Sequence, residues 1–98
     1  MELTNKQRSK LKAIAQNMDV VVKVGNKGIT QNVINSLQEA LEARELIKIS
    51  IAHQDREVRK ETALQLAEAS DSTLVNMIGK TALLFKINWK SPIISKEI

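Results

Sequence analysis

The chain has 98 residues, 43% of them apolar and 27% charged, which is typical of one globular domain rather than of a disordered segment. It contains no cysteine, no tyrosine and a single histidine, which excludes disulfides, multi-histidine metal sites and most acid–base catalytic groups. The net charge of +4 has the sign expected when the partner carries phosphates. No stretch is apolar enough for a signal peptide or a membrane span, so we expect a cytoplasmic protein without a membrane partner. We also expect a monomer with no cofactor and no metal.

The N-terminal part of the chain predicts a helix, a strand and a tight loop. Thr4 and Gln7 have the spacing of a capping box, which begins a helix over about 4–17. Its predicted buried stripe comprises Leu11, Ile14, Ala15 and Met18. The β-branched run 20–24 predicts a strand that is buried on both faces for most of its length. The strand ends at Gly25-Asn26-Lys27-Gly28, which we call the GNKG loop.

The rest of the chain predicts two more helices and three more strands. Thr30 is suited to cap a helix over roughly 30–44. A period-two apolar run then predicts a strand over 46–51, and a third helix is predicted over about 55–70. The predicted buried stripes are Val33, Ile34, Leu37 and Leu41 for the second helix and Val58, Thr62, Leu66 and Ala69 for the third. Gly79-Lys80 joins strands over 73–78 and 81–87 and suits a type II′ hairpin. Residues 89–98 contain Pro92 and have no period, which predicts a mobile tail.

The order of the predicted elements is therefore αβαβαββ. A strand–helix–strand unit of this length implies parallel pairing through a right-handed crossover, and the final hairpin implies antiparallel pairing. We expect a single compact α/β domain over residues 1–88, in which helices pack on a four-stranded mixed sheet.

Basic residues are concentrated toward both ends of the chain, and residues 32–71 are acidic overall. This distribution suggests one positive face formed by the first helix, the GNKG loop and the last hairpin, although ordinary solvated lysines would give the same pattern. The loop's glycines permit close approach of the backbone to a ligand, and the loop leads into a helix N-terminus, where free N–H groups favour an anion. The motif is neither a dinucleotide fingerprint nor a P-loop, and a glycine turn used for geometry alone is the alternative.

Four segments carry a resemblance to a known family: LTNKQRSKLKAIA, VVVKVGNKGIT, LEARELIKISI and LVNMIGKTALLFK. In this order and spacing they resemble the CRM domain, the YhbY-like family, over about residues 2–88. The resemblance implies a small RNA-binding domain, similar in fold to the C-terminal domain of bacterial translation initiation factor three. Through the single-domain bacterial members it also implies a role with precursors of the large ribosomal subunit. The family's GxxG loop, likened to that of KH domains, falls on residues 25–28.

The chain departs from the family pattern at two places. Val20 stands where the family often has proline, which affects only the entry to the strand. Phe85-Lys86 stands where a tyrosine–arginine pair is usual. This second change loses a hydroxyl and the bidentate fork of arginine, and it weakens specific reading of RNA by the pair.

We therefore expect a non-enzymatic protein that docks on structured ribosomal RNA during assembly of the large ribosomal subunit, with no small-molecule substrate. The expected RNA-binding residues are Gly25, Asn26, Lys27, Gly28, Lys6, Lys10, Lys12, Lys23, Lys80 and Lys86. The alternative is a protein–protein interaction module of the translation machinery, for which contact with RNA is incidental. Nuclease treatment in a pulldown separates these two hypotheses, because an association bridged by RNA disappears.

Three other side chains have competing interpretations. His53 follows a predicted strand, and a structural or solvated role is favoured over catalysis. Phe85 alternates with Leu83 and Ile87, so core packing is favoured over base stacking. Trp89 is equally compatible with stacking on a nucleobase and with covering an edge of the core. Because aromatic residues are scarce, stacking of bases across the sheet in the manner of an RRM is not expected.

Overall fold

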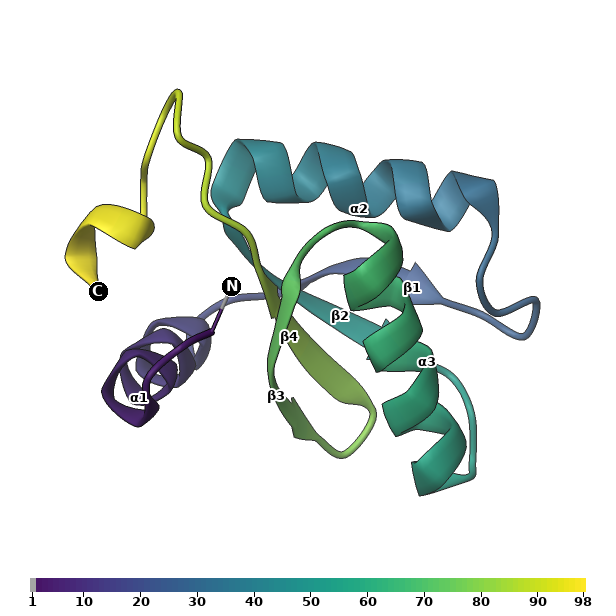
Figure 1. The fold of residues 1–98 in the computed structure, drawn as a ribbon. Helices are drawn as coiled ribbons and strands as arrows, with labels where there is room; N and C mark the ends of the chain where they lie inside the picture. Colours follow the sequence, from purple (N-terminus) through teal and green to yellow (C-terminus); the bar gives the residue numbers. More distant parts are fainter. Residues whose placement is uncertain (1) are drawn as a thin grey trace.

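The structure, a computed structural model, describes residues 2–98. The elements follow the predicted order: α1 (Asn5–Ala15), β1 (Val20–Val24), α2 (Gln31–Arg44), β2 (Leu46–Ile51), α3 (Arg56–Ala69), β3 (Thr73–Ile78), β4 (Thr81–Phe85) and a short 3-10 helix, η1 (Ser95–Glu97) (Figure 1). The strand order is β1-β2-β4-β3, with β1 parallel to β2 and the other two pairs antiparallel. The predicted four-stranded mixed sheet is thus confirmed. None of the helices within residues 2–98 is long and apolar enough to cross a membrane.

The sheet separates two apolar layers. On one face α2 and α3 bury Leu37, Leu41 and Leu66 against the isoleucines of β2. On the other face α1 buries Leu11 and Ala15 in a second cluster. The members of that cluster on the strands are Leu46, Val75, Leu83 and Phe85. Phe85 is therefore a core residue, as predicted. Burial of apolar area on both faces of the sheet is the main stabilising contribution to a fold of this kind.

Side-chain caps fix the starts of the three helices. The Thr4 hydroxyl accepts from the backbone N–H of Gln7, and the Gln7 side chain accepts from the backbone N–H of Thr4, each at 3.0 Å, which confirms the capping box. Thr30 caps α2 through the N–H of Val33 at 3.2 Å, and Asp55 caps α3. In the hairpin, Gly79 has a φ of 58° and Lys80 does not have a positive φ, which agrees with the predicted turn.

Two predicted burial patterns are wrong. β1 is an edge strand that buries Val22 and Val24 on one face only, and Lys23 between them is exposed. α3 buries Ala63 and Ala67 beside Leu66, whereas the predicted members of its stripe Val58 and Ala69 are exposed. The buried face of α3 thus lies on the side of Ala63 and Ala67, with Thr62 half-buried beside it. β4 also ends at Phe85, earlier than predicted.

The segment predicted to be a mobile tail is instead attached to the domain through the buried side chain of Glu45. The Oε1 atom accepts from the backbone N–H groups of Ile93, Ile94 and Ser95 at 2.6, 2.7 and 3.0 Å. The Oε2 atom accepts from the N–H of Asn88 and the hydroxyl of Ser95, both at 2.7 Å. Ile94 and Ile98 then pack against the α1 cluster. We call residues 88–98 the C-terminal strap.

Candidate nucleic-acid interface

Three loops leave the sheet at the same end. Val24 at the end of β1 pairs with Ile51 at the end of β2, and the N–H of Ala52 donates to the Val24 carbonyl at 2.9 Å. The N–H of Ile51 donates to the carbonyl of Lys80 in the hairpin at 2.8 Å. The GNKG loop, residues 52–54 and the turn 79–80 are therefore neighbours, and we call them together the loop edge.

The GNKG loop is a closed turn. The N–H of Gly28 donates to the carbonyl of Gly25 at 3.0 Å, which leaves Asn26 and Lys27 exposed at the corners. Gly28 has a φ of 67°, a left-handed conformation that glycine adopts without the strain of a Cβ. Apart from the chain neighbours, no other described residue lies within 4 Å of the position that a Cβ would take on either glycine. The positive φ at position 28 thus favours glycine there. Both glycines also leave open space beside the loop.

Two helices begin near the loop edge, and their N-termini differ in charge. The first turn of α2 contains no acidic residue. The N-cap of α3 is Asp55, and its first turn contains Glu57. The positive end of the helix dipole is therefore already compensated at α3 but not at α2. An anion at the loop edge is favoured on the side of the GNKG loop, from which α2 begins.

A shallow hollow of about 420 Å³ opens between the loops. Its lining residues are Asn26, Ala52, His53, Gln54 and Lys80. The side chains of Lys27 and Lys80 are exposed, and within residues 2–98 neither ammonium group has a hydrogen-bond or ion-pair partner. The loop edge therefore presents two uncompensated cations beside neutral hydrogen-bonding groups. This combination suits phosphate oxygens.

Arg59 positions these loops and was missed as a functional residue by the sequence analysis. Its Nη1 donates to the carbonyls of His53 at 2.7 Å and Gln54 at 2.9 Å, and its Nε donates to that of Gly79 at 3.2 Å. One guanidinium thus ties residues 52–54 to the hairpin. Nothing in the local sequence distinguishes Arg59 from the other basic residues of α3. His53 accepts from the N–H of Asp55 through Nδ1 at 3.0 Å, a structural role in the turn as predicted.

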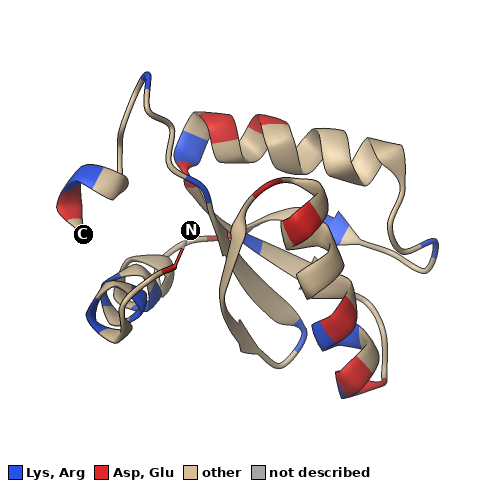
Figure 2. Cartoon of the chain, viewed as in Figure 1, with Lys and Arg blue, Asp and Glu red and all other residues tan. Residues whose placement is uncertain are grey.

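The other predicted site residues do not all meet at the loop edge. Lys6, Lys10 and Lys12 are exposed on α1, which lies on the far side of the view from the GNKG loop (Figure 2). Lys23 alternates with buried Val22 and Val24, so it points to the sheet face that carries α1. Lys48, which the sequence analysis missed, lies on that same face of the neighbouring strand. Lys23 and Lys48 therefore place cations on the sheet face that carries α1.

Lys86 is separated from these lysines. It follows β4 at the end of the sheet opposite the loop edge, and it is half-buried. Its ammonium donates to the carbonyl of Ser70, the C-cap of α3, at 3.5 Å. A lysine at the C-terminal end of a helix is favoured by the helix dipole. The geometry thus gives Lys86 a structural partner, in contrast to Lys27 and Lys80.

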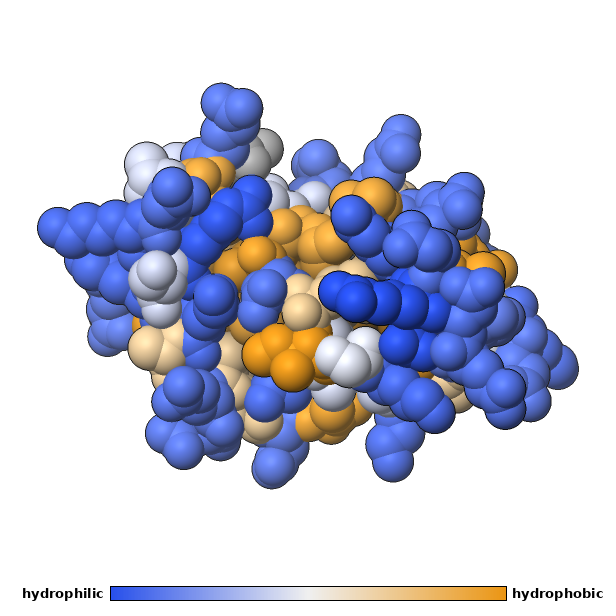
Figure 3. Space-filling model, turned by 90° about the horizontal axis from the view of Figure 1, so that it is seen from below, coloured by the Kyte–Doolittle hydropathy of each residue, from blue (hydrophilic) through white to orange (hydrophobic). Residues whose placement is uncertain are grey.

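The free edge of β3 is a second surface. Seen from below, the molecule is apolar at its centre and hydrophilic on both sides (Figure 3). The β3 edge there lines a hollow of about 490 Å³ together with Arg56, Arg59 and Lys60. However, Arg8 donates from Nη1 to the carbonyls of Leu74 and Val75 at 3.0 and 2.8 Å, and the pairing of β3 is irregular at this point. These features block addition of a further strand, which argues against a peptide partner at this edge.

The sequence profile of the CRS1 / YhbY (CRM) domain matches residues 3–86. The chain belongs to this family. This CRM-domain protein is 40% identical over 84 residues to the "Probable RNA-binding protein YqeI" of Bacillus subtilis, covering 86% of this chain and 88% of the relative. It is 37% identical over 90 residues to the "Probable RNA-binding protein PA4753" of Pseudomonas aeruginosa, covering 92% and 86%. The solution structure of the hypothetical protein SAV1595 from Staphylococcus aureus superposes with a TM-score of 0.79 at 36% identity, covering 89% of this chain and 91% of that one.

Proposed function

We propose that this CRM-domain protein is a non-catalytic RNA-binding protein that docks on structured RNA through the loop edge. The observation that carries the proposal is the juxtaposition of Lys27 and Lys80, on separate loops, with the N-terminus of α2. Two ammonium groups that have no protein partner within residues 2–98, together with a helix N-terminus whose first turn has no acidic residue, attract phosphates. The names of the relatives in B. subtilis and P. aeruginosa also support RNA as the partner.

We further infer that this RNA is ribosomal RNA in a precursor of the large subunit, which the resemblance to single-domain bacterial members implies. The α1 lysines, Lys23 and Lys48 would extend phosphate contact along the adjacent sheet face. Lys86 is left out of this interface because it is half-buried at the opposite end of the sheet. The protein would act as a cytoplasmic monomer that recognises the shape of folded RNA more than its sequence.

Charge reversal at Lys27 or Lys80 tests the loop edge. Each of Lys27→Glu and Lys80→Glu should weaken binding to a fluorescein-labelled hairpin RNA at least tenfold, about 1.4 kcal/mol, since each removes a cation and adds a repelling charge. Loss of one phosphate contact should also reduce the slope of log affinity against log salt by about 0.7–0.9. Fluorescence anisotropy at several salt concentrations measures both quantities, and thermal melts check folding.

Arg44→Glu is the matched control, because it changes the net charge equally at the exposed C-terminal end of α2, away from the loop edge. It should alter RNA affinity less than threefold, as expected for weak long-range electrostatics. If the double variant Lys27→Glu/Lys80→Glu is folded and binds RNA as the parent does, the loop edge is not the interface. If partners captured from cells survive nuclease treatment, the protein-interaction alternative is favoured instead.

A further inference from the structure

Trp89 is the only tryptophan of the chain, and it is 82% exposed. This exposure excludes the interpretation in which the indole covers an edge of the core. Trp89 lies beyond the end of β4, at the end of the sheet opposite the loop edge. Because the indole stays in water, it contributes little apolar burial to the stability of the domain, and packing of the domain does not explain why a tryptophan stands at this position.

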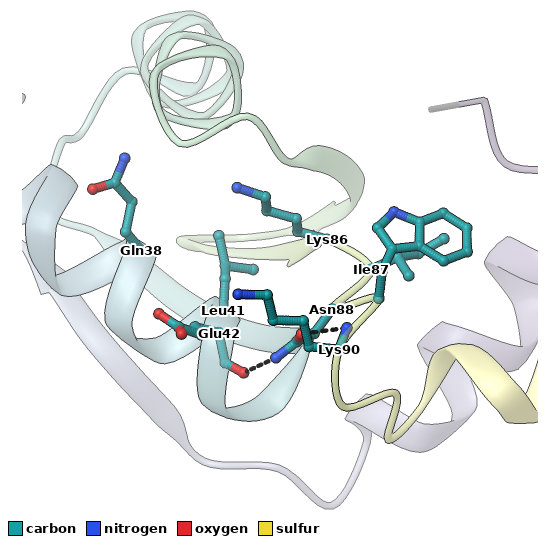
Figure 4. Close-up of a pocket in the computed structure, with 8 residues that line it drawn as sticks. Gln38, Leu41, Glu42, Lys86, Ile87, Asn88 and Lys90 are labelled. Carbon is teal, nitrogen blue, oxygen red and sulfur yellow. Dashed lines mark hydrogen bonds between the residues drawn. The ribbon is translucent and has the colours of Figure 1, made fainter.

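The backbone on both sides of Trp89 is held in place. Asn88 donates from its N–H to Glu45 at 2.7 Å and from Nδ2 to the carbonyl of Glu42 at 2.8 Å. Its Oδ1 accepts from the N–H groups of Lys90 and Ser91 at 3.1 and 3.2 Å. Figure 4 shows two of these hydrogen bonds: the one from Asn88 Nδ2 to the Glu42 carbonyl of α2, and the one from the N–H of Lys90 to Asn88 Oδ1. The indole is thus presented on an ordered turn, which lowers the entropic cost of binding a ligand there.

Trp89 lines three hollows that carry lysines. The hollow beside α2 has a volume of about 500 Å³ and is also lined by Lys86, Lys90 and Glu42. Lys86 and Lys90 extend in the same direction over it, toward α2 (Figure 4). The hollow toward β3 is about 540 Å³ and includes Lys86 and Asp71, and the hollow toward η1 is about 290 Å³ and includes Lys96. The ring therefore has open space beside it and more cationic than anionic side chains around it.

We propose that Trp89 stacks on an unpaired base of the bound RNA and that the exposed Lys90 neutralises a phosphate that flanks this base. The inference rests on the proposed RNA-binding function and adds a second contact of different chemistry. The hollow at the loop edge is lined by no phenylalanine or tryptophan, and the ring of its His53 is engaged by the N–H of Asp55, so the loop edge suits phosphates. An exposed indole beside lysines is instead the combination that binds single-stranded nucleotides. The protein would thus contact a folded RNA element at one end and an adjoining unpaired nucleotide at the other.

Two hairpin RNAs that differ only in a single-stranded 3′ extension of six adenosines test the proposal. Because the chain has one tryptophan and no tyrosine, its intrinsic fluorescence reports on Trp89 alone. The extended hairpin should quench this fluorescence and the blunt hairpin should not. Trp89→Ala should weaken binding of the extended hairpin about tenfold, with unchanged affinity for the blunt one, and Trp89→Phe should restore part of the loss.

Ile93→Ala is the matched control: Ile93 is an exposed apolar residue of the same strap and lines none of the three hollows. It should bind both hairpins as the parent does. Unchanged fluorescence and parent-like binding by Trp89→Ala, with Lys27→Glu still weakening both hairpins, would overturn the stacking site and leave the proposed function intact. Failure of the parent to bind either hairpin would overturn both. Loss of a nuclease-resistant protein complex in Trp89→Ala, with RNA affinity unchanged, would assign the ring to a protein partner and overturn the proposal.

Discussion

Glu45 combines two features that are each unfavourable in isolation. Its φ of 64° is in the left-handed region that non-glycine residues rarely adopt, and its side chain is fully buried. Burial alone would raise the pKa of the carboxyl group, but the hydrogen bonds from Ser95, Asn88 and Ile93 outweigh burial and lower the pKa from 4.5 to about 2. The ionised form is therefore a part of the fold, and the strap depends on it.

This lowered pKa predicts a loss of stability in acid. The unfolded chain binds a proton at Glu45 near pH 4.5 and the folded chain only near pH 2, so the stabilisation is complete above about pH 5 and is lost as the pH falls from 4.5 toward 2. In urea unfolding at pH 7, 4 and 3, Glu45→Gln should be destabilised at pH 7 and should lose less stability on acidification than the parent.

Glu42→Gln is the control for this experiment, since Glu42 is exposed one turn earlier and only its backbone carbonyl holds the strap. It should follow the pH dependence of the parent. Parallel curves for Glu45→Gln and the parent would mean that the carboxylate does not carry the acid sensitivity.

At the scale of elements, the sheet within the described residues has two free edges, β1 and β3, and apolar side chains line the hollow beside β3. Arg8 of α1 donates hydrogen bonds to the carbonyls of Leu74 and Val75 in β3. Arg59 of α3 donates to the carbonyl of Gly79, just beyond the end of β3. Two helices on opposite faces thus each supply an arginine to the same edge. Pairing with a second copy would require these hydrogen bonds to break.

Removal of the Arg8 guanidinium should expose the edge. Arg8→Met keeps most of the apolar stem but loses both hydrogen bonds, and we expect a loss of about 1–2 kcal/mol, with a decrease in Tm of about 4–8 °C for each kcal/mol. Light scattering at increasing protein concentration should show more self-association than for the parent. Lys6→Met, an exposed change on the same helix, should change neither quantity. A monodisperse Arg8→Met protein would show that the arginine does not protect the edge.

At the scale of the whole molecule, the proposed contacts with RNA lie at both ends of the sheet and on the face that carries α1. If the protein serves the large subunit, it should sediment with precursor or mature large-subunit particles at low salt and leave them as salt rises. About five phosphate contacts would give a log–log salt slope near −3.5 to −4.5. Sucrose-gradient fractions probed for the protein measure this, and exclusive co-sedimentation with the small subunit would contradict the proposal.

Patterns between residues close in sequence predicted most of the fold. The capping box at Thr4 and Gln7, the period-two isoleucines of β2 and the glycine of the hairpin are local signals, and each produced the expected element. The one-sided burial of β1 was not predictable in this way, because it depends on the position of the strand at the edge of the sheet.

The candidate site was predictable only in part. The GNKG loop could be found from its glycines and from its place before a helix, and Lys80 from its place in a hairpin. The contribution of Arg59 depends on carbonyls that belong to two separate loops, and Lys48 is recognisable only once β1 and β2 are paired. Lys86 was grouped with the other lysines by charge, which carries no information about its contact with Ser70.

The Glu45 carboxylate also determines where this domain can be cut. The match to the family profile ends at residue 86, yet all five hydrogen bonds to the carboxylate come from residues 88–95. A fragment that stops at the end of the profile would lose all five of these hydrogen bonds, and we expect it to be less stable than the full chain. We therefore expect the autonomous folding unit to extend at least to Ser95. When a CRM domain with glutamate at this position is excised from a longer protein, its boundary is better set by the donors to that glutamate than by the limits of an alignment.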